Sequence, residues 1–168
     1  MEIYLLRHGI AYDLGDSGSR TDAERALSPD GKIKMYQQAE GMRQLDLKFD
    51  AILTSPLIRA RETAEIVAEV LRQSDKLEVC QALALGADPE RVCTVLRDQF
   101  GSAGAVLLVG HEPDLSLLGA YLISSRGDAA LQMKKGSLCR IDSLRVVKAG
   151  GSLRWLLTPT QMRLLGKK

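Results

Sequence analysis

The chain has 168 residues, and its 23 basic and 21 acidic side chains give a formal net charge of +2. Hydrophobic residues make up 45% and charged residues 26%, which predicts a globular protein organised as one domain over residues 1–168. The balanced charge argues against a nucleic-acid partner or a membrane surface. The N-terminus shows neither a signal peptide nor a membrane span, so we expect a cytoplasmic protein.

The first predicted element is a short buried strand that ends at three residues suited to binding a ligand. Its largely apolar run from Met1 to Leu6 is too short for an independent helix. Arg7, His8 and Gly9 follow at once, and the glycine allows a turn and leaves room near the backbone. The carboxyl ends of strands are where α/β sheets bind ligands. Taken alone, the triplet also fits a strand that merely ends in polar residues.

Strands and helices then alternate. Residues 10–25 are polar and predict a loop, after which Ser28 and Pro29 have the side chains of a helix N-cap and first turn. That helix is expected to bury one face, formed by Ile33, Tyr36, Ala39, Met42 and Leu45. Further strands are predicted at residues 49–53, 77–80 and 105–109, with helices opening after residues 54–56, 88–89 and 110–113. This alternation predicts a largely parallel sheet with helices on both faces.

The pattern changes near the C-terminus. Residues 137–147 and 152–157 are two extended runs around Gly150 and Gly151, which predicts a β-hairpin. Thr158 and Pro159 then predict the start of a last short helix.

No metal or cofactor site is predicted. The chain contains no His-Glu-X-X-His motif and no Gly-X-X-X-X-Gly-Lys loop. The cysteines are odd in number and form no Cys-X-X-Cys pair, so we expect three reduced thiols at Cys80, Cys93 and Cys139.

Three segments share the order of a strand, a polar turn and a helix start: residues 7–9, 55–61 and 110–113. In a parallel sheet these turns lie at the same edge, which would gather His8 and His111 with Arg7 and Arg59. Arginines bind phosphate oxygens bidentately and helix N-termini favour anions, so this edge suits a phosphate. Arg61 is expected instead to pair with glutamates on the helix surface. Taken alone, His111 also fits a histidine buried in the core. Glu112 also fits a carboxylate that only interacts favourably with the dipole of the helix.

Together these motifs resemble the histidine phosphatase superfamily, which is phosphoglycerate mutase-like. The resemblance rests on residues 7–9, on Ser55-Pro56 with Arg59 and residues 62–64, and on Gly110-His111, and it covers nearly the whole chain. Residues 7–11, 27–31 and 110–115 resemble the phosphohistidine phosphatase SixA group within it. The resemblance implies a three-layer α/β/α sandwich with a six-stranded mixed, mostly parallel sheet, in which one strand near the C-terminus runs antiparallel.

The resemblance also implies roles for the clustered residues. His8 would be the nucleophile and would become phosphohistidine, which water then hydrolyses. The phosphoryl oxygens would be held by Arg7, Arg59 and His111, with Gly9 and Glu112 also at the phosphate.

One departure from the family pattern concerns the proton donor. Much of the superfamily has a glutamate general acid soon after the third strand, whereas residues 81–87 contain no carboxylate. Asp88 is a candidate proton donor, although its position before Pro89 also fits a helix N-cap. Asp13 is a second candidate.

We therefore expect a phosphatase that needs no metal and acts on phosphohistidine in a protein such as a histidine phosphotransfer domain. A small-molecule phosphomonoesterase of the same superfamily is the alternative, and the missing acid counts against it. A phosphate-binding module without turnover is a third interpretation. His8 argues against that module, because binding alone needs arginines and amides but no nucleophile.

Overall fold

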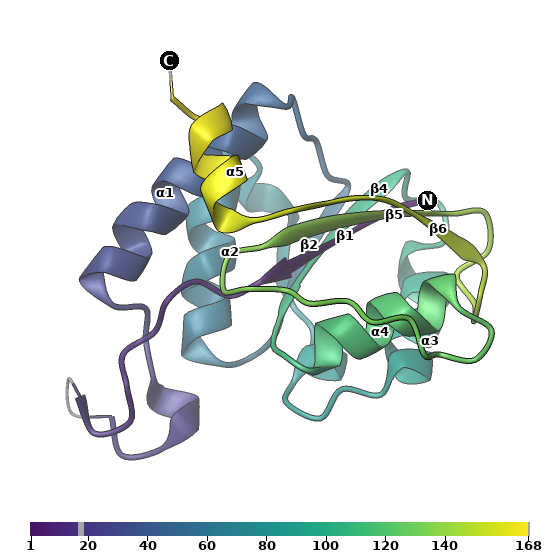
Figure 1. Cartoon of the computed structure of the whole chain (residues 1–168), viewed down its shortest axis with the longest axis horizontal. Helices are drawn as coiled ribbons and strands as arrows, with labels where there is room; N and C mark the ends of the chain where they lie inside the picture. Colours follow the sequence, from purple (N-terminus) through teal and green to yellow (C-terminus); the bar gives the residue numbers. More distant parts are fainter. Residues whose placement is uncertain (17–18, 168) are drawn as a thin grey trace.

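The computed structural model describes residues 1–16 and 19–167, and its centre is a mixed sheet with the strand order β3-β2-β4-β1-β5-β6 (Figure 1). The strands are β1 (Glu2–Arg7), β2 (Ala51–Thr54), β3 (Leu77–Val79), β4 (Ala105–Gly110), β5 (Leu138–Ser143) and β6 (Gly151–Leu157). β1 to β4 are parallel, and β5 runs antiparallel to both β1 and β6. This confirms the predicted mixed sheet and the β5–β6 hairpin.

Helices cover both faces of the sheet, which confirms the three-layer sandwich (Figure 1). One face carries α1 (Pro29–Gln44), α2 (Ile58–Leu71) and α5 (Pro159–Leu165), and the other carries α3 (Pro89–Phe100) and α4 (Asp114–Ile123). Single 3-10 turns lie at η2 (Asp22–Glu24), η3 (Ser74–Lys76) and η4 (Gln81–Leu83). Within the described residues, no helix has the length and apolarity needed to cross a membrane.

Three helices begin at the caps that the sequence predicts. Ser28 accepts a hydrogen bond from the backbone N–H of Gly31 at 3.0 Å, and Asp88 accepts one from Glu90 at 3.2 Å. Thr158 caps α5 in the same way. α2 begins two residues after the predicted Ser55-Pro56 turn, at Ile58.

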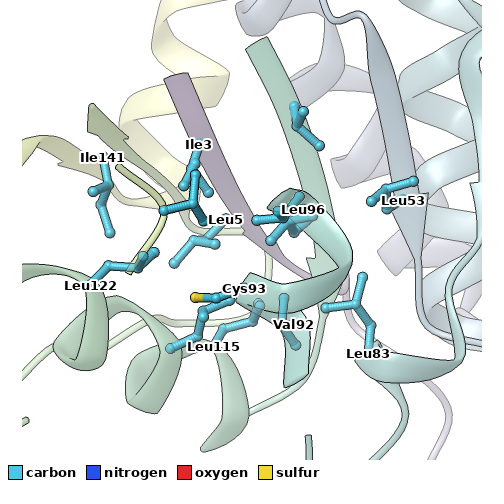
Figure 2. Close-up of a cluster of buried hydrophobic side chains, with 14 of the residues drawn as sticks. Ile3, Leu5, Leu53, Leu83, Val92, Cys93, Leu96, Leu115, Leu122 and Ile141 are labelled. Atoms are coloured by element: carbon cyan, nitrogen blue, oxygen red, sulfur yellow. The ribbon is translucent and has the colours of Figure 1, made fainter. Parts of the chain in front are cut away.

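The sheet separates two apolar cores. Figure 2 shows the core under α3 and α4, where Leu96 and Leu115 pack against Leu5 of the sheet. Cys93 and Cys139 are buried in this core as free thiols, and the free thiol of Cys80 is half-buried at its edge. These thiols agree with the expectation of reduced cysteines.

The apolar face predicted for α1 is only partly right. Ala39 and Met42 are buried, but three of the five residues are exposed: Ile33 (60%), Tyr36 (43%) and Leu45 (38%). The buried face runs instead through Gly31, Met35, Ala39 and Met42. Residues that are always three positions apart drift around a helix of 3.6 residues per turn. Residues separated by four and then three positions stay on one face.

The strand order places the predicted site residues side by side. β1 and β4 are neighbours, with Arg7 opposite Gly110, so His8 and His111 follow directly at the same edge. The backbone N–H of His8 donates to the carbonyl of Gly110 at 3.0 Å. β2 lies on the other side of β4 and leads into the turn before Arg59.

Candidate active site

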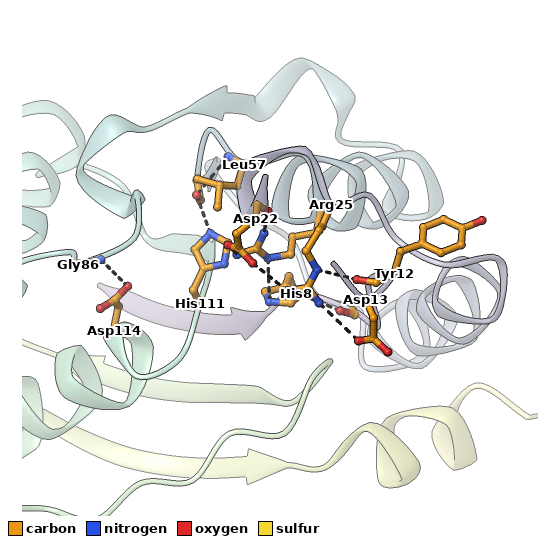
Figure 3. Close-up of polar contacts among 12 residues, drawn as sticks. His8, Tyr12, Asp13, Asp22, Arg25, Leu57, Gly86, His111 and Asp114 are labelled. Carbon is orange, nitrogen blue, oxygen red and sulfur yellow. Dashed lines mark hydrogen bonds and ion pairs between the residues drawn. The ribbon is translucent and has the colours of Figure 1, made fainter. Parts of the chain in front are cut away.

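His8, Arg59 and His111 meet at the carboxyl edge of the sheet. The two imidazole rings lie 5.2 Å apart between centroids, and Figure 3 shows them close together. Arg59 stands in the first turn of α2 and donates from Nε to Nε2 of His8 at 3.3 Å. All three side chains are buried, with exposed fractions of 6%, 4% and 2%. The topology thus brings together residues from three distant segments.

The hydrogen bonds of His8 define its tautomer. Nδ1 lies 2.7 Å from the carbonyl oxygen of Gly9, which can only accept, so Nδ1 carries the proton. Nε2 therefore holds a lone pair, which accepts from Arg59. The pKa of His8 is lowered to about 3, chiefly by burial, with the Gly9 carbonyl opposing this and the nearby His111, Arg59 and Arg7 adding to it. His8 is thus a neutral imidazole with a nucleophilic nitrogen.

Gly9 is fixed by a buried threonine. The Gly9 N–H donates to Oγ1 of Thr63 at 3.0 Å, and that hydroxyl donates to the carbonyl of Arg59 at 2.7 Å. A Cβ at Gly9 would lie 3.2 Å from Leu27 and 3.3 Å from Met35. Since its N–H is already engaged, Gly9 acts in this arrangement by positioning the ring of His8.

His111 has one engaged and one free ring nitrogen. Nε2 lies 2.8 Å from Oγ of Ser55, and Nδ1 is buried with no partner among the described residues. Burial lowers the pKa of His111 to about 4, with Arg59 and Arg7 adding to the effect and Asp22 opposing it. His111 is therefore neutral near pH 7, and a bound phosphate dianion would raise its pKa.

Arg7 and Glu112 flank the two histidines in the sequence and influence each other electrostatically. Arg7 donates from Nη1 to the carbonyl of Met133 at 2.7 Å, while its Nε and Oε1 of Glu112 are buried without partners among the described residues. Burial lowers the pKa of Arg7, and the Glu112 carboxylate opposes this. Burial raises the pKa of Glu112, and Ser116 and Arg7 oppose it. Unsatisfied buried groups of this kind are typical of a site that takes a polar ligand.

Asp22 is a site residue that sequence reasoning missed. Its Oδ2 accepts from Nη2 of Arg59 at 2.8 Å, and its backbone carbonyl accepts from Nη1 at 2.6 Å. A hydrogen bond from Arg25, followed by one from Arg59, holds the pKa of Asp22 below its usual range, although partial burial opposes them. The signal that was available is the spacing of Thr21 and Glu24, which form a capping box around this turn.

The remaining candidates lie on the surface. Asp88 is exposed and caps α3, and the side chain of Asp13 is 90% exposed, 4.0 Å from Arg25. Arg61 is half-exposed and lies 3.9 Å from Glu65, which confirms the expected surface pairing. Over residues 1–16 and 19–167, no group of three His, Cys, Asp or Glu side chains is placed to hold a metal ion.

The geometry predicts that both histidines remain neutral well below their usual pKa of about 6.5. ¹⁵N NMR should show His8 as the Nδ1–H tautomer, with neither ring titrating between pH 7 and pH 5, because burial disfavours the charged forms. Urea-unfolded protein is the control, in which both rings should titrate near 6.5. Below about pH 6.5 the unfolded chain binds protons at these histidines and the folded protein does not. The free energy of unfolding should therefore fall as pH drops below about 6.5. An Nε2–H tautomer or a pKa near 6.5 for folded His8 would contradict this.

Comparison with known proteins places this site in a family. The model of the histidine phosphatase superfamily (branch 1) matches residues 3–84. An uncharacterized protein of Picosynechococcus sp. is 35% identical over 144 residues, which cover 85% of this chain and 86% of that protein.

Two further relatives have functional names. Phosphohistidine phosphatase SixA of Escherichia coli is 22% identical over 165 residues, 98% of each chain. The structure of SixA complexed with tungstate matches with a TM-score of 0.84 at 22% identity, covering 95% of this chain and 98% of that one. Alpha-ribazole phosphatase from Shigella flexneri matches with a TM-score of 0.69 at 21% identity, covering 95% and 97%. These structures share the fold of this chain. The family model and the relative that is 35% identical show that the chain belongs to the histidine phosphatase superfamily.

Proposed function

We propose that this protein hydrolyses phosphohistidine on another protein, such as a histidine phosphotransfer domain, with His8 as the phosphoryl acceptor. The observation that carries the proposal is the bond between Nδ1 of His8 and the carbonyl of Gly9, which leaves Nε2 as the nucleophile. The similarity to SixA over nearly the whole chain supports the choice of substrate.

In the first step, the lone pair of His8 Nε2 attacks phosphorus in line with the substrate's P–N bond. The new bond forms between Nε2 and phosphorus, and the electron pair of the breaking bond returns to the substrate nitrogen. A phosphohistidine ring can be protonated on its other nitrogen near neutral pH, so it leaves as neutral imidazole. Arg59 must release Nε2 for this attack, because it donates there at 3.3 Å in the free protein.

Three side chains are placed to hold the phosphoryl oxygens. Arg7 and Arg59 supply charged donors, and the buried Nε of Arg7 has no partner among the residues that the structure describes. His111 has a free Nδ1, and the dianion would favour its protonated form, which donates from both nitrogens.

In the second step, water attacks phosphorus from the side that the leaving group has vacated. The bond between phosphorus and His8 breaks, and its electron pair returns to Nε2. The water proton goes to the phosphate product, so His8 regains its starting tautomer.

Asp22 and Asp88 are poor proton donors, which favours a P–N bond over an alkyl ester. An alkoxide leaving group demands a proton donor, but Asp88 is engaged as a helix cap. Asp22 is held ionised by Arg25 and Arg59. Imidazole leaves without this help.

Arg59 and Arg61 form a matched pair of tests. Arg59→Ala should lower turnover by about a hundredfold or more, because it removes a buried donor to the phosphoryl oxygens. Arg61→Ala should leave turnover nearly unchanged, since that side chain is half-exposed beside Glu65. Both variants are assayed on a phosphohistidine-bearing protein after thermal melts have checked their folding. Greater loss in Arg61→Ala than in Arg59→Ala would place the phosphate elsewhere.

A comparison of substrates tests the proposed function itself. With a chelator present throughout, we expect fast turnover of a phosphohistidine-bearing phosphotransfer domain, slower turnover of an aryl phosphate and the slowest turnover of a sugar phosphate. Asp88→Asn serves as the control and should not change phosphohistidine turnover. Sugar phosphate turnover equal to that of phosphohistidine would favour the alternative function, a small-molecule phosphomonoesterase. Alpha-ribazole phosphatase has the same fold as this chain. Activity that is lost on chelation and restored by a divalent ion would contradict a metal-free mechanism.

A further inference from the structure

Asp22 binds the edge of the Arg59 guanidinium that is formed by Nη1 and Nη2. All three guanidinium nitrogens already donate: Nε to His8, Nη1 to the Asp22 carbonyl and Nη2 to the Asp22 carboxylate. Nη1 and Nη2 form one of the two edges with which arginine binds phosphate bidentately. In the free protein, therefore, a carboxylate is bound on an edge of Arg59 that could also bind phosphoryl oxygens.

The segment of residues 19–27, here called the Asp22 loop, holds this carboxylate in place. Glu24 accepts from the backbone N–H groups of Arg20 and Thr21 at 2.7 and 3.1 Å. Arg25 donates to Oδ1 of Asp22 at 2.8 Å and to the carbonyl of Tyr12 at 2.6 Å. Figure 3 shows Asp22 and Arg25, with dashed lines from Arg25 to Tyr12 and Asp13. The carboxylate is thus presented by a preformed turn.

The charges make Asp22 and phosphate competitors. Arg25 and Arg59 keep Asp22 ionised, because they lower its pKa. A phosphoryl dianion on Arg59 would lie against this carboxylate, and two anions at such short range repel each other. Binding of the dianion at Arg59 is therefore expected to weaken the contact between Asp22 and the terminal nitrogens of Arg59.

We propose that Asp22 is a competing carboxylate, which holds Arg59 in the free protein and leaves it when a phosphoryl group binds. The inference rests on the proposed phosphate site. When a binding-competent state is only partly populated, the apparent affinity falls by that fraction. Asp22 therefore weakens the binding of inorganic phosphate and speeds its release as product.

The test measures the binding of inorganic phosphate by calorimetry to the full chain and to three variants. Asp22→Ala and Asp22→Asn should bind phosphate about tenfold more tightly or more, since hydrogen bonds to a charged group no longer compete. Asp13→Asn removes the same charge from an exposed side chain that does not touch Arg59, and should change binding by about twofold or less. Asp22→Asn keeps the size of the side chain, so it still tests the competition if Asp22→Ala does not fold.

Unchanged or weaker phosphate binding in the folded Asp22 variants would overturn the inference. Arg59→Ala separates that failure from failure of the proposed site. If Arg59→Ala abolishes phosphate binding, the site stands and only the competition is wrong. If phosphate binds equally well without Arg59, or does not bind the wild type or any variant, both proposals fail.

Hydrogen exchange gives a second readout that a purely structural role of Asp22 would not produce. In the wild type, phosphate should accelerate amide exchange in residues 19–27, because the loop loses the hydrogen bonds between Asp22 and Arg59. Ligands ordinarily slow exchange at the segments around them, so the direction is diagnostic. Slower exchange in this segment would contradict the displacement of Asp22.

Discussion

The hydrogen bond from Nδ1 of His8 to the carbonyl of Gly9 decides which nitrogen of a buried imidazole carries the proton. The fold supports this 2.7 Å contact from two sides. The neighbouring strand β4 fixes the backbone of His8 through Gly110, and Thr63 of α2 fixes the N–H of Gly9. Because burial also keeps the ring neutral, Nε2 has the lone pair that the proposed nucleophile needs without the help of a separate base.

The same burial creates a site that favours an anion. Removal from water lowers the pKa values of Arg7, His8 and His111. Cationic neighbours add to this effect for the two histidines, whereas a nearby carboxylate opposes it for Arg7 and another opposes it for His111. A phosphoryl dianion would offset that cost for all of them at once. In the free protein, Asp22 supplies part of the missing negative charge at Arg59.

Much of the fold was predictable because its signals are local. Ser28, Asp88 and Thr158 mark helix starts through caps that act within three residues, and the first-turn position of Arg59 distinguished it from Arg61. The buried face of α1 was predicted wrongly because a repeat of three residues resembles helical periodicity over a short stretch. Ile33, Tyr36 and Leu45 consequently lie on the exposed side.

The rest of the site depends on contacts that no local pattern encodes. Asp22 lies 37 residues from Arg59 in the chain, and their ion pair exists only because folding brings the loop to the first turn of α2. The proximity of the histidines follows from the pairing of β1 with β4, which the alternation of elements does not specify. The tautomer of His8 depends on one backbone carbonyl, and so it becomes visible only in three dimensions.

The central claim is that Nε2 of His8 takes the phosphoryl group, and trapping the phosphoenzyme tests it most directly. The protein is mixed with a phosphohistidine-bearing protein, quenched in alkali within milliseconds, digested and analysed by mass spectrometry. We expect phosphate on the peptide that contains His8, lost on acid treatment and absent from His8→Ala. A phosphoryl group on any other residue, or full turnover by His8→Ala, would contradict it.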